Sequence, residues 1–262
     1  MALSINLSGK TVLITGVTSG IGAGIAQVFA QAGANVAGCG RSSIDSEAAI
    51  KFMESVKKYG RQVFYVSVDV TSPDDLKILV DEVINRFGKL DTLISNAGVN
   101  IFEGLEECTT ERWEYNMQLN LTSHWQLARY CKPYLVESKG TILIMTSNHA
   151  YYSLPGCFPY NVTKTALTGL VRSITLEWSP DVRCIGLAPG FIYTEGCEKW
   201  FESLGDTVHV REKVEALHPV KKIGSVEEVG VWCVFLTSEL ASFAAGHTYL
   251  LDGGRSAVMQ DF

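Results

Sequence analysis

The chain has 262 residues, of which 47% are hydrophobic, so it can close one sizeable core and does not need a second domain. Its 22 Lys and Arg against 28 Asp and Glu give a net charge of −6 without a block of like charge, which argues against nucleic acid as a partner. No apolar stretch reaches about 18 residues and no signal peptide begins the chain, so we predict a cytoplasmic protein without a membrane partner.

Metal and disulfide chemistry are not indicated. The seven cysteines are scattered, odd in number and never spaced as C-x-x-C, so neither a disulfide framework nor a zinc site is expected. The five histidines show no ligand spacing either. We therefore predict reduced thiols and no metal site.

Short β-rich runs alternate with longer amphipathic stretches along the whole chain, without a linker or repeat. We predict strands at Thr11–Thr15, Asn35–Cys39, Gln62–Val68, Thr92–Ser95, Thr141–Thr146, Arg183–Leu187 and Thr248–Leu251. The clearest helices are Ile21–Ala32, Pro73–Phe87, Glu111–Tyr134, Tyr160–Trp178 and Glu227–Leu236. Several strands are continuous apolar runs, which is typical of strands buried on both faces. The pattern predicts an α/β fold: a single doubly wound Rossmann-type domain over residues 1–262, with a seven-stranded parallel sheet flanked by helices on both faces.

A glycine-rich turn joins the first strand to the first helix. Glycines there permit a tight turn, let backbone amides approach a pyrophosphate, and place the helix N-terminus near its negative charge. A purely structural turn is the alternative. The candidate cofactor-binding residues in this turn are Gly16, Thr18, Ser19, Gly20, Ile21 and Gly22.

Tyr160 and Lys164 lie one helical turn apart on the same face of a predicted helix. A phenol has a reference pKa of about 10, and a nearby cation lowers it, so this pair can exchange a proton with an alcohol or carbonyl. Such pairs also arise by chance. Ser147 follows the fifth strand and can hydrogen-bond a substrate oxygen, with Thr146 as the competing hydroxyl.

These features occur together in one order along the chain. The glycine spacing, Asn96-Ala97-Gly98, Asn120, Ser147, Tyr160-x-x-x-Lys164 and Pro189-Gly190 together resemble the short-chain dehydrogenase/reductase family, classical type, over essentially the whole chain. The resemblance implies four catalytic residues: Asn120, Ser147, Tyr160 and Lys164. Asn120 would hold a water that links the lysine to solvent. A solvent-satisfied helix kink is the alternative, since Asn is unfavourable inside a helix.

The same resemblance assigns further contacts to a nicotinamide cofactor. Asp69 and Val70 would line the adenine pocket, and Asn96, Ala97 and Gly98 would pack against the cofactor. The segment after the sixth strand would meet the nicotinamide carboxamide or a phosphate through Pro189, Gly190, Ile192 and Thr194. Tyr160 and Lys164 would also contact the cofactor.

Arg41 decides between the two nicotinamide cofactors. An acidic residue at the end of the second strand binds the ribose of NAD, whereas a nearby arginine suits the 2′-phosphate of NADP. This chain has Gly40-Arg41 there, and Ser42 can donate a further hydrogen bond, so NADP(H) is favoured and NAD(H) remains possible. Ser19 weighs against NADP, because many NADP-dependent relatives carry an arginine at that position.

The substrate is expected to be small and polar. His149, Tyr152 and Tyr193 join Ser147 and Tyr160 as candidate substrate-binding residues, and residues 191–218 form the expected substrate-covering segment. Three hypotheses stay open: an oxidoreductase of a sugar, polyol or sugar acid; a 3-oxoacyl thioester reductase; and a nucleotide-sensing protein that kept the fold and lost the chemistry. The resemblance also implies a homotetramer, with a subunit-contacting tail from Leu251 to Phe262.

Overall fold

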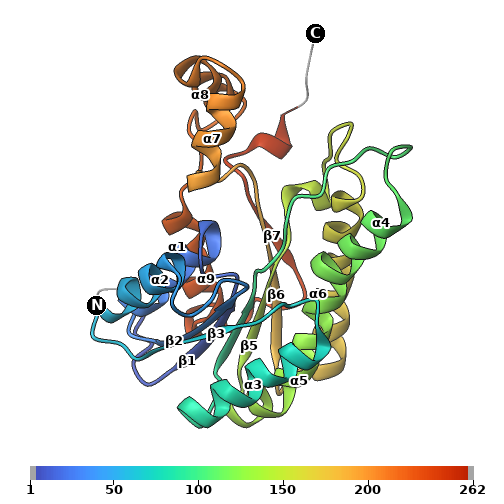
Figure 1. The fold of residues 1–262 in the computed structure, drawn as a ribbon. Coiled ribbons are helices and arrows are strands. Elements are labelled where there is room, and N and C mark those ends of the chain that lie inside the picture. Colours follow the sequence, from blue (N-terminus) through green and yellow to red (C-terminus); the bar gives the residue numbers. More distant parts are fainter. Residues whose placement is uncertain (1–3, 259–262) are drawn as a thin grey trace.

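A computed structural model describes residues 4–258 of the chain. Within that range a seven-stranded sheet, in the order β3-β2-β1-β4-β5-β6-β7, carries helices on both faces (Figure 1). Every pair of neighbouring strands is parallel. The predicted α/β fold with a seven-stranded parallel sheet is therefore confirmed.

All the predicted strands form, with ends within two residues of the predicted ones. The strands are β1 (Thr11–Thr15), β2 (Asn35–Gly40), β3 (Val63–Ser67), β4 (Thr92–Ser95), β5 (Thr141–Met145), β6 (Arg183–Pro189) and β7 (Thr248–Leu251). Strands β1 and β5 are buried at every position, because helices cover the sheet on both sides.

The helices within residues 4–258 are α1 (Gly20–Gln31), α2 (Glu47–Lys57), α3 (Pro73–Phe87), α4 (Thr110–Met117), α5 (Ser123–Ser138), α6 (Tyr160–Trp178), α7 (Glu195–Ser203), α8 (Thr207–Ala216) and α9 (Val226–Thr237). Local sequence sets their ends. At the start of α3 the Ser72 hydroxyl accepts a hydrogen bond of 3.2 Å from the Asp75 amide, and Pro73 takes the first helical position. Gly88 ends the same helix with a left-handed φ of 71°.

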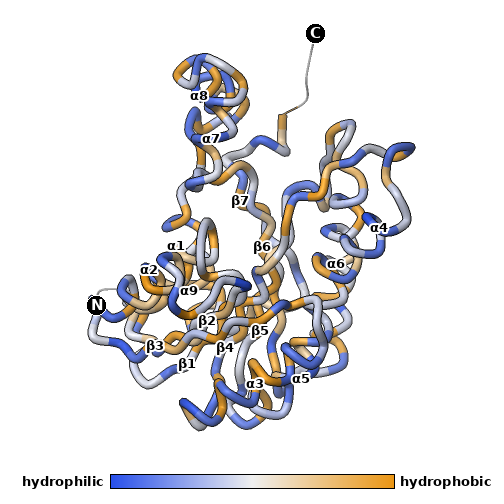
Figure 2. Tube along the Cα trace, viewed as in Figure 1, coloured by the Kyte–Doolittle hydropathy of each residue, from blue (hydrophilic) through white to orange (hydrophobic). Residues whose placement is uncertain are grey.

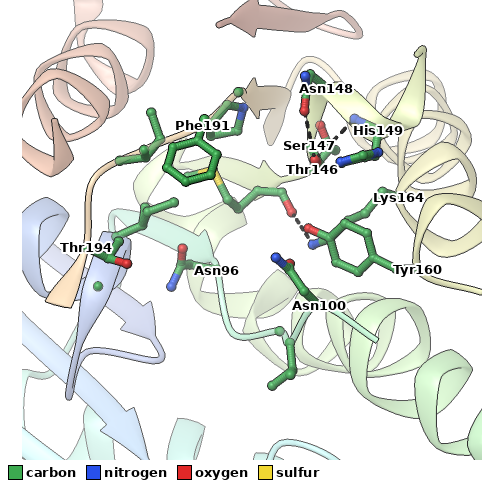
Figure 3. A pocket seen from close by; sticks show the side chains of 18 of the residues that line it. Asn96, Asn100, Thr146, Ser147, Asn148, His149, Tyr160, Lys164, Phe191 and Thr194 are labelled. Atoms are coloured by element: carbon green, nitrogen blue, oxygen red, sulfur yellow. Dashed lines mark hydrogen bonds between the residues drawn. The ribbon is translucent and has the colours of Figure 1, made fainter. Parts of the chain in front are cut away.

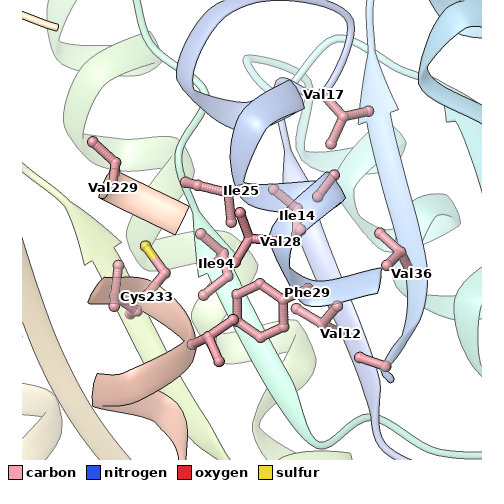
Figure 4. Close-up of a cluster of buried hydrophobic side chains, with 14 of the residues drawn as sticks. Val12, Ile14, Val17, Ile25, Val28, Phe29, Val36, Ile94, Val229 and Cys233 are labelled. Carbon is pink, nitrogen blue, oxygen red and sulfur yellow. The ribbon is translucent and has the colours of Figure 1, made fainter. Parts of the chain in front are cut away.

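The sheet separates two hydrophobic cores. One lies between the sheet and helices α1, α2 and α9, and includes Ile14, Phe29, Val229 and Cys233 (Figure 4). The other lies under α3, α5 and α6 on the opposite face. Figure 2 shows hydrophobic residues along the strands and more hydrophilic residues on the outer helices. Because helices cover both faces of the sheet, the carboxyl ends of the parallel strands form the edge at which a ligand site can lie.

The predicted helix over Glu111–Tyr134 forms, but a π-helical turn lies in its middle. Helix α4 ends at Met117, a π-helical turn spans Gln118–Thr122, and α5 follows. Asn120 lies in that turn, fully buried. Its side-chain amide bonds the backbone of a neighbouring loop instead of the solvent, and the helix departs from regular α geometry at this residue.

Helices α7 and α8 stand beyond the carboxyl edge of the sheet (Figure 1). They lie within the predicted substrate-covering segment, 191–218, for which no helices were predicted. Phe201, Val214 and Ile223 give this region a small core of its own. No helix within residues 4–258 combines the length and the apolar character needed to cross a lipid bilayer.

Candidate active site

A large cleft opens at the carboxyl ends of the strands, around the point between β1 and β4 where the strand order reverses. Its volume is about 1440 Å³, more than a single small molecule needs and enough for a dinucleotide with a small substrate. Open α/β sheets bind ligands at this point. Of the predicted site residues, all line the cleft except Ser42, Asn120 and Tyr193.

The glycine turn forms one wall of the cleft. Gly16 has a left-handed φ of 74°. A Cβ added at Gly22 would lie 2.1 Å from the Gly16 carbonyl oxygen, so no other residue fits there without moving the turn. Ser19 precedes α1 but makes no capping hydrogen bond with its side chain. The amides of the first helical turn therefore face the cleft, and their partial positive charge suits a phosphate.

Thr15 joins the ends of β1 and β4, which form the floor of the cleft. Its hydroxyl accepts hydrogen bonds of 2.9 Å from the backbone amides of both Asn96 and Ala97. The Asn96 side chain returns a 2.9 Å hydrogen bond to the Thr15 carbonyl oxygen. The ends of β1 and β4 are thus joined by three bonds, which fix the Asn-Ala-Gly segment next to the glycine turn. The sequence reasoning did not single out Thr15 for this role.

Arg41 follows β2 and lines the cleft with an exposed guanidinium. The loop around it is anchored from β3, because the Tyr65 hydroxyl donates to the Ser42 carbonyl oxygen at 2.7 Å and the Ser67 hydroxyl to that of Arg41 at 3.4 Å. The Ser42 side chain does not line the cleft. No Asp or Glu follows β2 directly, so this strand end lacks the carboxylate that would repel a 2′-phosphate.

Asp69 and Val70 follow β3 and both line the cleft. One carboxylate oxygen of Asp69 accepts from the amide and the hydroxyl of Thr71, at 2.9 and 2.8 Å. This local turn holds Asp69 in place beside the cleft, and Ser72, not Asp69, caps the following helix.

Tyr160 begins α6 and Lys164 lies one turn further on; both side chains are almost completely buried at the cleft wall. The Lys164 ammonium lies 5.5 Å from the centre of the Tyr160 ring and donates a 3.0 Å hydrogen bond to the Met145 carbonyl oxygen. Figure 3 shows both beside Ser147 and His149, with Thr194 across the cleft. The helix and the end of β5 therefore converge on one point.

Burial governs the protonation of this pair. It raises the pKa of Tyr160 to about 12, an effect that a hydrogen bond with Ser147 partly opposes. It lowers the pKa of Lys164 to about 8. The direction for Tyr160 is opposite to the lowering that we expected from Lys164, because burial penalises the phenolate. At neutral pH Tyr160 keeps its proton and Lys164 keeps its charge.

Ser147 lies two residues beyond β5 and is buried at the cleft wall. Its hydroxyl accepts from the His149 amide at 3.2 Å and lies 3.4 Å from the Asn148 side-chain oxygen. The competing hydroxyl, Thr146, donates instead to the Leu187 carbonyl oxygen of β6 at 3.1 Å. Ser147 is therefore the better placed of the two to meet a substrate oxygen.

Asn120 lies behind the cleft wall. Its side-chain oxygen accepts from the Val99 amide at 3.0 Å, and its nitrogen donates to the Val99 carbonyl at 3.0 Å and to Asn116 at 2.8 Å. A Cβ added at Gly98 would lie 2.6 Å from the Asn120 oxygen, which explains the glycine. Asn120 thus orders the loop that passes Lys164, and its water-holding role stays a prediction.

The segment after β6 closes the other side of the cleft. Pro189, Gly190, Ile192 and Thr194 all line it, and the Thr194 methyl group lies 3.5 Å from the Cβ position of Gly20 in the glycine turn. The segment that follows β6 is therefore in contact with the start of α1, where phosphates would bind.

Tyr193 does not point into the cleft. Its hydroxyl donates to Glu198, its ring packs 6.5 Å from that of Phe201, and the Arg211 guanidinium lies 5.4 Å from its centre. These contacts hold α7 and α8 together, so the proposed substrate contact of Tyr193 is corrected to packing within the covering segment. Phe191 lines the cleft in its place.

Aromatic and polar side chains surround the remaining space. The Phe102 ring lies edge-on to both Tyr160 and His149, at 5.4 and 5.7 Å, and Tyr152 also lines the cleft. Phe102 comes from the loop after β4, and no pattern in the sequence pointed to it. Within residues 4–258 no three His, Cys, Asp or Glu side chains gather in a way that could hold a metal ion.

Comparison with known proteins agrees with this arrangement. The family model described as enoyl-(acyl carrier protein) reductase matches residues 16–256. An L-fucose dehydrogenase of Oryctolagus cuniculus is 34% identical, over 97% of this chain and 87% of its own. A 3-oxoacyl-[acyl-carrier-protein] reductase of Thermotoga maritima is 31% identical, over 95% of this chain and 98% of its own.

Solved structures match the same length of chain. The crystal structure of L-sorbose reductase from Gluconobacter frateurii, in complex with NADPH and L-sorbose, is similar with a TM-score of 0.92 and 32% identity, covering 98% of this chain and all of that one. The family model, the relatives and the cleft geometry agree. The chain therefore belongs to the short-chain dehydrogenase/reductase family, classical type, and is an NAD(P)-dependent oxidoreductase that acts on CH–OH groups.

Proposed function

We propose that the protein is an NADP(H)-dependent oxidoreductase that interconverts a secondary alcohol, or a hemiacetal, and a carbonyl on a small polar substrate. The substrate would be a sugar, polyol or sugar acid. The observation that carries this proposal is the convergence of Ser147, Tyr160 and Lys164 on one point of a cleft with polar and aromatic walls. Asn100, Asn148 and His149 offer hydrogen bonds at that point, which a hydroxylated substrate can use.

In this proposal the residues of the chain transfer one proton to or from the substrate oxygen. The cofactor, when bound, supplies or accepts the hydride. For reduction, the Tyr160 hydroxyl gives its proton to the substrate oxygen while the Ser147 hydroxyl hydrogen-bonds the same oxygen. The Lys164 charge stabilises the phenolate that remains. The raised pKa of Tyr160 keeps that proton available at neutral pH.

The cofactor preference rests on Arg41. Replacing Arg41 with Gln removes the cation that a 2′-phosphate would pair with, so the ratio of kcat/KM with NADPH to that with NADH is expected to fall about 10- to 100-fold. Arg86→Gln, an exposed change at the far end of α3, is the matched control. For each variant, the ratio is measured from the absorbance of the reduced nicotinamide at a fixed substrate concentration while NADPH or NADH is varied. A wild-type protein that uses NADH as well as NADPH would contradict the assignment.

The alternative substrate is a 3-oxoacyl thioester on a carrier, as the Thermotoga maritima relative suggests. The matched family description also names a carrier-protein reductase, but one that acts on enoyl groups. Such a carrier is acidic and needs a basic patch. Three lysines could contribute to such a patch: Lys222 pairs with Glu228, Lys132 lies over the Trp178 ring, and Lys221 donates to the Ala216 carbonyl oxygen. Only Lys222 is in an ion pair, and Lys132 lies on α5 and does not line the cleft, which leaves Lys221 alone there. The three lysines therefore form no common basic patch, and the sugar hypothesis is preferred.

A substrate panel tests the proposal directly. Reduced nicotinamide is followed with keto sugars, sugar acids and acetoacetyl thioesters, and we expect the highest kcat/KM on a hydroxylated compound. Higher kcat/KM on the thioesters would favour the carrier reductase. NADPH binding without turnover on any member would favour the third hypothesis, a nucleotide-sensing protein.

We also propose a homotetramer. Large apolar side chains are exposed on α6, where Leu176 is 83% exposed, and after α9, where Phe243 is 104% exposed, and contact with further copies of the chain would bury them. Light scattering after size exclusion is expected to give four times the 28.7 kDa of one chain. Phe235→Glu, on the exposed face of α9, is expected to lower that mass. A stable monomer would contradict the proposal. Residues 259–262 of the expected contact tail lie outside the described residues.

A further inference from the structure

The segment after β7 places a second arginine at the cleft. The Asp252 carboxylate accepts hydrogen bonds from the amides of Gly254 and Ser256, at 3.0 and 2.8 Å. Gly253 and Gly254 are left-handed, and the Val220 amide donates to the Gly253 carbonyl oxygen at 3.3 Å. This turn is therefore pinned against the loop that follows α8, and Arg255 comes directly after it.

Arg255 lines the same cleft as Ser147 and Tyr160. It also acts on His149, since burial first, and then the charge of Arg255, lower the pKa of that imidazole. Within residues 4–258 the Arg255 guanidinium has no ion pair and no hydrogen bond from its side chain. The nearest acid in the sequence, Asp252, is already engaged by backbone amides.

The charge of the cleft is unbalanced at this end. Among the described residues that line it, the only carboxylate is Asp69, which follows β3. Arg255 follows β7, at the opposite edge of the sheet, with four strands between it and β2, where Arg41 stands. A cofactor phosphate paired with Arg41 or with the start of α1 is therefore not the natural partner of Arg255.

We propose that Arg255 binds a carboxylate of the substrate, which makes the substrate a polyhydroxylated carboxylic acid, that is, a sugar acid. This inference rests on the proposed function and narrows its substrate class. A guanidinium presents a planar fork of donors that matches the two oxygens of a carboxylate. The acid group would be held by the segment after β7 while the reacting carbon lies beside Ser147 and Tyr160.

The test uses two pairs of compounds that differ only in one terminal group. 5-Keto-D-gluconate and L-sorbose share the keto carbon and the hydroxyls, but the first ends in a carboxylate and the second in a hydroxymethyl group. D-Gluconate and D-glucitol differ in the same way. The full chain is assayed with NADPH on the first pair, and the second pair is titrated by calorimetry onto the protein saturated with NADP⁺.

Arg255→Gln is expected to lower the ratio of kcat/KM for the keto acid to that for L-sorbose about 10- to 100-fold, the worth of a hydrogen bond to a charged group. Gluconate affinity relative to glucitol should fall by a similar factor. Arg255→Lys should keep part of both ratios, since it keeps the charge without the fork. Arg86→Gln should leave both ratios unchanged. The Kd for NADPH in each variant reports whether the fold and the cofactor site are intact.

Unchanged ratios in Arg255→Gln, or equal losses on both members of each pair, overturn the assignment. So does a loss of NADPH affinity that accounts for the whole effect. The proposed function fails separately: the wild-type protein would reduce neither carbonyl compound, while its preference for gluconate over glucitol, and the loss of that preference in Arg255→Gln, would still support carboxylate binding.

Discussion

Replacing Tyr160 with Phe is expected to lower kcat for reduction by about 10²- to 10⁴-fold, the usual contribution of a positioned general acid. The change removes one hydroxyl from a buried side chain whose ring packs edge-on against those of Phe102 and His149, so the packing of the ring is preserved. The Kd for NADPH, measured by fluorescence titration, should stay within a few-fold of wild type, because the glycine turn and Arg41 are untouched.

Tyr130→Phe on α5 is the matched control, since it removes the same hydroxyl from a ring outside the cleft. Its kcat is expected to equal that of wild type. If Tyr160→Phe kept wild-type turnover, the proton would have to come from another group, and Tyr160 would be a packing residue of the cleft wall.

Replacing Gly22 with Ala is expected to weaken NADPH binding at least tenfold and to lower the free energy of unfolding by about 1–3 kcal/mol. The added methyl carbon would lie 2.1 Å from the Gly16 carbonyl oxygen and 2.7 Å from the Asn96 side-chain nitrogen. Either the turn or the Asn96 side chain must move, and both belong to the cofactor side of the cleft. Denaturant unfolding and NADPH titration measure the two effects.

Gly169→Ala on α6 is the control that separates packing from helix propensity. Both glycines lie inside helices, where propensity alone predicts that Ala stabilises by about 0.5–1 kcal/mol. At Gly169 the new carbon meets only the Arg172 side chain, at 3.9 Å, so that gain should be realised. Equal stabilisation of both variants would show that the glycine turn is looser than its contacts indicate.

The sheet could be predicted from the sequence because a strand buried on both faces carries its own signal. The apolar runs at 11–15 and 141–145 needed no knowledge of their neighbours, and chain order then fixed which strand ends meet. The residues at those strand ends, from Gly16 to Thr194, could be predicted because they belong to short sequence motifs with a characteristic local backbone geometry.

Other parts of the site depend on contacts between distant segments. Nothing near Asn120 in the sequence shows that its amide binds the Val99 backbone, or that a π-helical turn forms there inside the predicted helix. Tyr193 does not line the cleft; its hydroxyl donates to Glu198 and its ring lies beside the Arg211 guanidinium. The pKa of Tyr160 is raised because the side chain is buried. The spacing of Tyr160 and Lys164 in the sequence gives no information about that burial.

The hydrogen bonds of Thr15 have a thermodynamic consequence. Because one hydroxyl already joins the backbones of Asn96 and Ala97 to β1, the surface on which we expect the cofactor to lie is ordered without a ligand. Binding there should cost little conformational entropy, so the contacts made with the phosphates and the nicotinamide are expressed almost fully as affinity. Changes in the segment that carries α7 and α8 leave the three bonds between Thr15 and the Asn-Ala-Gly segment untouched, so we expect such changes to alter substrate selection more than cofactor affinity.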